Sequence, residues 1–225
     1  MRDKIKTQVE IAEKNNLPDI IVGGCKAYDE NDKFLFERKF NSTEDYNVWL
    51  MLLKTNLGNT CANLFKSTYF NNGGRWNTAM KSSQDYTLMF GILKESAKVV
   101  FEESQDTILI RRTSDSISHQ NFKENWIRYI ELRMEMLKHI IQSDLDVPMQ
   151  EAYQIIFDAI RIFYKHDKKL ALEYYIKIIP EDFVPSTSVT TGSTYIKLFK
   201  LLGFKRTQWL QSLFSKVKKQ EETWG

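Results

Sequence analysis

The 225-residue sequence has 42% hydrophobic and 27% charged residues, a balance that excludes an intrinsically disordered chain. Its formal net charge of +3 is too small to indicate a nucleic-acid partner. The two cysteines, Cys25 and Cys61, lie outside any CxxC or Cys/His cluster, so we expect reduced thiols and no zinc site or disulfide scaffold. No secretory signal and no run of about 18 apolar residues is present, which predicts a cytoplasmic protein.

The first half of the sequence predicts mixed helices and strands. Apolar residues at helical spacing predict a helix over residues 3–16, which Leu17-Pro18-Asp19 ends. The β-rich run 19–28 and the alternating segment 33–40 predict a hairpin or two neighbouring strands. Further along we expect a helix over 43–54, a short extended segment up to Phe65, a turn at 71–74, a helix opening at Ser82, and strands at 98–101 and 107–111.

Beyond residue 113 the pattern is that of helices alone. We expect a helix over 121–142, one that starts with Pro148 and runs to about His166, and one that Asp167 caps and that stops before Pro180. The predicted fold class is therefore α/β (mixed), followed by an all-helical C-terminal region. The expected domains are residues 1–118, a helical region at 119–182, and a linker with basic helices at 183–225.

Basic residues are concentrated in the C-terminal tail. Residues 186–225 hold seven Lys or Arg and two Glu, whereas the rest of the chain holds 25 basic and 27 acidic residues. Apolar and aromatic residues alternate with these cations across 193–219, which is typical of an amphipathic helix on an anionic membrane surface. A helix that packs against its own domain, with its lysines in water, explains the same pattern, and both alternatives stay open.

The most distinctive motifs lie between residues 58 and 112. An extended segment opens at Gly58-Asn59-Thr60, a glycine turn contains Gly73-Gly74-Arg75-Trp76, and Gln84-Asp85-Tyr86-x-Leu88 opens an apolar helix. Two strands follow, the second ending at Arg111-Arg112. This order resembles the second half of the GT-A catalytic domain of bacterial family 2 glycosyltransferases. The resemblance covers roughly residues 1–118, and Gln84-Asp85-Tyr86-x-Leu88 is its most specific part.

The resemblance implies that Asp85 is the catalytic base. In inverting members the acid at this place takes the proton from the acceptor hydroxyl as that oxygen attacks the anomeric carbon. A hydroxyl is a poor nucleophile until a nearby carboxylate removes its proton. A structural alternative exists, because Ser82-x-x-Asp85 is also the acid variant of a helix capping box.

Six further residues are candidates for binding the substrate, each with a structural alternative. Trp76 is expected to stack on a sugar ring or to pack as an ordinary tryptophan. Asn59 and Asn63 are expected to bond sugar hydroxyls or to serve in turns, while Gln84 adjoins the catalytic acid. Arg111 and Arg112 are expected to meet phosphate oxygens or to be exposed arginines at the end of a strand.

The resemblance also implies a nucleotide-sugar donor and a glycan or lipid-linked acceptor, in surface polysaccharide or glycolipid synthesis. The complete family enzyme uses a divalent metal, Mn or Mg, held by a DxD motif. The sole DxD here, Asp144-Leu145-Asp146, lies between two expected helices and is better explained by capping. We expect no metal to be bound by these residues.

Because the donor-binding half is not in the sequence, we expect the chain alone to be inactive. A non-catalytic helical interaction module or a gene remnant is the alternative. The expected location is the cytoplasm, with the inner face of the membrane as a second site reached through the tail.

Overall fold

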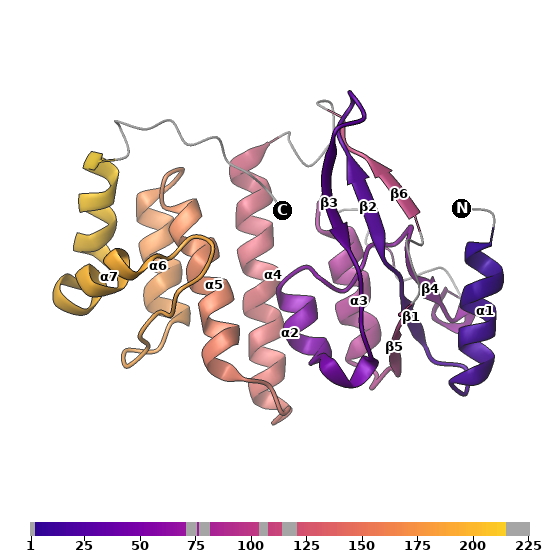
Figure 1. Ribbon diagram of the computed structural model, residues 1–225. Coiled ribbons are helices and arrows are strands. Elements are labelled where there is room, and N and C mark those ends of the chain that lie inside the picture. The colour runs from indigo at the N-terminus through magenta and orange to yellow at the C-terminus, as the bar shows by residue number, and fades with distance from the viewer. Residues whose placement is uncertain (1–2, 71–75, 77–81, 104–107, 114–120, 215–225) are drawn as a thin grey trace. The chain divides into compact units, whose positions relative to one another are not determined.

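The computed structural model divides the chain into two units, residues 1–122 and residues 123–225. The structure describes residues 3–70, 76, 82–103, 108–113 and 121–214. The first unit combines strands and helices, and the described part of the second consists of helices joined by loops (Figure 1). The predicted fold class, mixed α/β followed by a helical C-terminal region, is confirmed.

The first sheet is built around a short, fully buried strand. Strand β1 (Ile20–Val22) pairs antiparallel with β4 (Leu64–Phe65) and parallel with β5 (Val99–Phe101). A run of β-branched residues suits this central position, because both faces of the strand are covered. Helix α1 (Lys4–Lys14) precedes β1, and the helix predicted at 3–16 is confirmed.

The second sheet has β2 (Cys25–Tyr28) at its centre. Strand β3 (Phe34–Arg38) pairs with it antiparallel, and β6 (Ile108–Arg111) pairs with it parallel. The predicted hairpin is therefore confirmed, but the run 19–28 is not one strand. It breaks at Gly23-Gly24, where the chain passes from the first sheet to the second. A Cβ atom on Gly24 would lie 2.7 Å from the carbonyl oxygen of Arg38, so only glycine fits without a shift.

Among the described residues, four short helices lie between β3 and β5 along the chain. They are η1 (Thr43–Asp45), α2 (Val48–Leu53), η2 (Ser67–Phe70) and α3 (Gln84–Leu93). The helix predicted over 43–54 begins too early. The Asn47 side chain accepts hydrogen bonds from the backbone N–H groups of Trp49 and Leu50, so it is the N-cap of α2, which begins at Val48. Helices α2 and α3 pack together, and the Trp49 and Phe90 rings lie 6.3 Å apart. The turn predicted at 71–74 lies outside the described residues.

The second unit contains four helices in its described part: α4 (Phe122–Gln142), α5 (Met149–Phe163), α6 (Lys168–Ile178) and α7 (Ser193–Phe214). The helix predicted at 121–142 is confirmed. Pro148 precedes α5 as its N-cap and is not its first helical residue. Gly203, with a φ of 70° and a ψ of 176°, breaks α7 into two segments. Residues 193–214 therefore form two short helices on either side of a glycine.

A cluster of aromatic rings anchors α7 to the rest of its unit. The ring of Phe157 on α5, which is fully buried, lies 5.3–6.1 Å from four others, those of Phe183, Tyr195, Phe199 and Phe204. Phe204 also stacks on Tyr175 of α6, with ring centroids 4.1 Å apart. One side of each half of α7 is thus part of a hydrophobic core. Within the residues that the structure describes, no helix combines the length and apolar character needed to cross a bilayer.

Asp167 caps α6, as predicted. One carboxylate oxygen accepts a hydrogen bond from the backbone N–H of Leu170 at 3.0 Å, and the other lies 2.7 Å from the Lys123 ammonium on α4. These two contacts lower the pKa of Asp167, the backbone hydrogen bond contributing most. Each of them is stronger when the carboxylate is charged.

We predict that Asp167→Ala destabilises the protein by about 1 kcal/mol at neutral pH. Because the pKa of Asp167 is lower in the folded than in the unfolded chain, its contribution is complete above about pH 4 and is lost as the pH falls through the folded value. Urea unfolding followed by circular dichroism should show the two proteins converging in acid. A difference in stability that stays constant down to the lowest pH would contradict this assignment.

Candidate functional site

The carboxyl ends of the parallel strands β1 and β5 lie side by side. Val22 ends β1 and Phe101 ends β5, and the next residue, Glu102, donates its backbone N–H to the Val22 carbonyl at 2.9 Å. Ligands of open α/β sheets bind at such carboxyl ends, where loops and side chains converge beyond the last hydrogen bonds of the strands. The predicted site residues are therefore expected to lie at this edge.

Asn63 joins two loops at this edge. Its side-chain oxygen accepts a hydrogen bond from the backbone of Gly23 at 3.2 Å, and its amide nitrogen donates to the Leu57 carbonyl at 3.0 Å. The side chain is buried. Gly58 passes directly over it: a Cβ atom at Gly58 would lie 2.1 Å from the Asn63 oxygen, and its φ of 68° also favours glycine. Gly58 and Asn63 are matched partners of one tight loop.

Tyr86 ties the start of α3 to the same loop. Its hydroxyl donates a hydrogen bond to the Gly58 carbonyl at 3.0 Å. Since Gly58 itself lies against Val22, this bond holds the first turn of α3 near the carboxyl end of β1. Two residues of the resemblance, Gly58 and Tyr86, therefore make a direct contact across 28 positions of sequence.

Asp85 occupies the first turn of α3 and is half-buried. The predicted capping box is wrong: the N-cap is Ser83, in a left-handed conformation with a φ of 60°, and it makes no side-chain capping bond. Within the described part of the chain, the Asp85 carboxylate forms no hydrogen bond or ion pair. The catalytic role of Asp85 stays a prediction.

A second polar group at this edge was not predicted from the sequence. Glu102 is 2% exposed, and its carboxylate accepts a hydrogen bond from the Gln8 side chain at 3.0 Å; the Gln8 amide nitrogen also donates to the Ala62 carbonyl at 2.8 Å. Burial lowers the pKa of the nearby Lys4 ammonium, and the charge of Glu102 acts in the opposite direction. The signal that identifies Glu102 is its place directly after a strand that parallels β1.

The other amide and aromatic candidates have mixed environments. The Asn59 side chain accepts a hydrogen bond from the Ala62 backbone at 2.9 Å, as an asparagine in a turn does. Gln84 is the first residue of α3 and is half-buried. Trp76 is 40% exposed, and the residues on either side of it lie outside the described part of the chain. Substrate binding by Asn59, Asn63, Gln84 and Trp76 stays a prediction, although Asn63 has a clear structural role.

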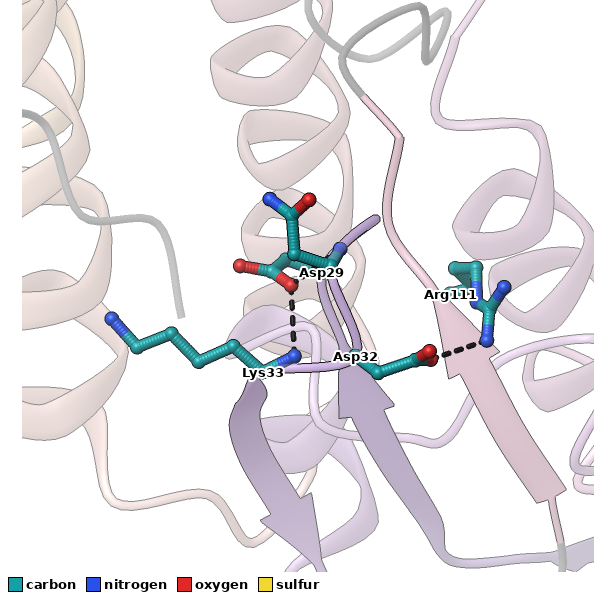
Figure 2. Close-up of polar contacts among 5 residues, drawn as sticks. Asp29, Asp32, Lys33 and Arg111 are labelled. Atoms are coloured by element: carbon teal, nitrogen blue, oxygen red, sulfur yellow. Dashed lines mark hydrogen bonds and ion pairs between the residues drawn. The ribbon is translucent and has the colours of Figure 1, made fainter.

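Arg111 and Arg112 lie beside Tyr28, at the end of β2 opposite to Gly24. Arg111 pairs with Tyr28 across the sheet and forms an ion pair with Asp32 in the β2–β3 turn (Figure 2). The same turn is braced by the Asp29 carboxylate, which accepts a backbone hydrogen bond from Lys33 at 2.9 Å. The Arg112 guanidinium lies over the Phe36 ring, 5.0 Å from its centroid. Phosphate binding by Arg111 and Arg112 also stays a prediction.

The residues that the structure describes do not form a metal site. In the described part of the chain no three His, Cys, Asp or Glu side chains are grouped closely enough to hold an ion. Asp144 and Asp146 lie in the connection between α4 and α5, in the helical unit rather than at the carboxyl edge of the first sheet. No chemical step is therefore assigned to a metal here.

The first unit is thus an α/β structure with a carboxylate at the carboxyl edge of its sheet. Part of the chain is similar to proteins named uncharacterised glycosyltransferases from three Rickettsia species. The identity is 32% over 105 residues for the R. bellii protein, 36% over 106 residues for R. felis, and 35% over 106 residues for R. conorii. Each match covers 45% of this chain but only 15–17% of the relative. The comparisons thus relate the chain to glycosyltransferases. No protein-family model and no solved structure matches it.

We predict that Asn63→Ala destabilises the first unit by about 2–3 kcal/mol, because the buried Gly23 N–H and Leu57 carbonyl lose their partner. Asn31→Ala, at an exposed position in the β2–β3 turn, is the control and should change stability by less than about 0.5 kcal/mol. Urea unfolding followed by circular dichroism measures both. Equal stability of the two variants would contradict the structural role of Asn63.

Proposed function

We propose that residues 1–118 form the acceptor-side part of a GT-A, family 2 glycosyltransferase domain, with Asp85 as its base. The observation that carries the proposal is the hydrogen bond between Tyr86 and Gly58, which fixes the Asp85 turn beside the carboxyl end of β1. The similarity to proteins named glycosyltransferases supports it independently. Two of the segments that carry the resemblance, Gly58-Asn59 and Gln84-Asp85-Tyr86, are brought together by this contact.

The proposed reaction follows from the carboxylate. Asp85 accepts the proton of an acceptor hydroxyl, and the resulting oxygen attacks the anomeric carbon of the donor sugar. The new C–O bond forms as the bond to the nucleoside diphosphate breaks, and the diphosphate leaves with its electron pair. Attack from the face opposite the leaving group inverts the anomeric centre. Asp85 lies in the first turn of α3 and is half-buried, so part of its side chain is accessible to an acceptor.

The proposed substrates are a nucleotide-sugar donor and a glycan or lipid-linked acceptor, used at the cytoplasmic side in surface polysaccharide or glycolipid synthesis. The complete family enzyme is expected to use a divalent metal, and no residue of this chain is proposed to bind it. The task of this chain is then to position and deprotonate the acceptor.

We predict that Asp85→Asn, in the complete protein that the gene encodes, lowers sugar transfer by at least about 100-fold. The amide keeps the shape of the carboxylate but cannot accept the proton, so donor binding should be unchanged. Release of nucleoside diphosphate from a panel of nucleotide sugars measures turnover, and titration with nucleoside diphosphate and manganese measures donor binding.

Asp45→Asn is the matched control, because Asp45 is an exposed acid in the first turn of another short helix, η1. Its transfer rate should equal that of the unaltered protein. If Asp85→Asn retains most of its activity while donor binding is intact, Asp85 is not the base.

A further inference from the structure

Helix α7 has one side fixed against its own unit and one side exposed to solvent. Tyr195, Phe199 and Phe204 are 3–8% exposed and contact the ring of Phe157. The Arg161 guanidinium adds a polar attachment, donating to the Gln211 side chain at 2.9 Å and lying over the Tyr195 ring. These contacts determine which residues of both halves of α7 face outward.

The outward residues share two properties, which define what we name the α7 basic face. Its cations are exposed, and α7 contains no acidic residue between Ser193 and Phe214. Two large apolar side chains lie among them, Leu201 at 79% and Trp209 at 54% exposure. The face consists of Lys197, Lys200, Leu201, Lys205, Arg206 and Trp209.

We propose that the α7 basic face binds the surface of an anionic lipid bilayer. Four cations without a neighbouring acid on the helix match a negatively charged surface, and each cation near such a surface raises binding severalfold. Leu201 and Trp209 then leave water for the boundary between headgroups and acyl chains, where tryptophan is favoured. A nucleic-acid or acidic-protein surface would use the cations but would not account for both exposed apolar side chains.

Fewer residues of the tail are available to contact lipid in the structure than the sequence alone indicates. From the sequence, every apolar residue of the tail was a candidate, but the rings at 195, 199 and 204 belong to the core of the second unit. Lys216, Lys218 and Lys219 of the predicted 193–219 surface lie outside the described residues. The proposed contact therefore consists of shallow, mainly electrostatic attachment with two apolar insertions. It does not depend on the proposed transferase activity.

The test is flotation of the full chain with vesicles of phosphatidylcholine alone or mixed with phosphatidylglycerol. We expect binding to the mixed vesicles only, with release at raised salt because exposed charges are screened. Lys197→Glu with Lys200→Glu should lower the partition coefficient by at least about tenfold. The control is Lys168→Glu with Lys169→Glu, the same charge change on exposed lysines of α6, which should leave binding within about twofold.

A second pair of variants tests the apolar contribution. Leu201→Ala with Trp209→Ala should weaken binding at every salt concentration, whereas Ile176→Ala, at an exposed apolar position on α6, should not. Circular dichroism confirms folding, and Lys205→Gln with Arg206→Gln repeats the charge test on the second half of α7. Equal effects of the α7 and α6 charge variants would overturn the proposal. Loss of binding in the α7 charge variants with no effect of the Leu201 and Trp209 changes would contradict the proposed insertion of these two side chains.

Discussion

The amide of Asn63 is bonded on both sides, to the N–H of Gly23 and to the carbonyl of Leu57. Gly23 is the first residue after the buried strand β1, and Leu57 leads into Gly58, the acceptor for the Tyr86 hydroxyl. Through these bonds one asparagine connects the end of the central strand to the helix that bears Asp85. The geometry of the candidate site depends on this connection, since a buried amide that lost either partner would cost stability as well as position.

In the second unit, aromatic packing and arginine hydrogen bonds hold the last helices in place. The Phe157 ring contacts aromatic rings of α7 and of the loop before it. Arg161, one turn later on α5, donates hydrogen bonds to the Thr190 carbonyl and the Gln211 side chain. Burial lowers the pKa of Arg161, and Tyr195 and the charge of Asp158 act in the opposite direction. Because these contacts use the inner side of each half of α7, they leave the basic residues of both halves exposed. The proposed membrane contact is thus a consequence of how the aromatic core orients the helix.

Periodicity and capping residues were sufficient to predict most helices, including the cap of α6 by Asp167, and the β2–β3 hairpin. The break at Gly23-Gly24 was not predictable from local pattern, because the close approach of Arg38 that requires glycine is a contact between distant residues. The resemblance marked Asp85 and Tyr86, but the bond from Tyr86 to Gly58 and the buried pair Gln8–Glu102 arise only from folding. Ser82 looked like a cap, yet the left-handed conformation of Ser83 starts the helix one residue later than a capping box requires.

The central claim is that the Asp85 carboxylate meets the acceptor hydroxyl. A crystal structure of the complete protein with a non-transferable donor analogue and a bound acceptor tests it most directly. We expect one Asp85 oxygen within about 2.6–3.2 Å of the acceptor hydroxyl, on the side away from the leaving diphosphate. An acceptor bound elsewhere, with Asp85 bonded only to the backbone N–H groups at the start of α3, would contradict the account.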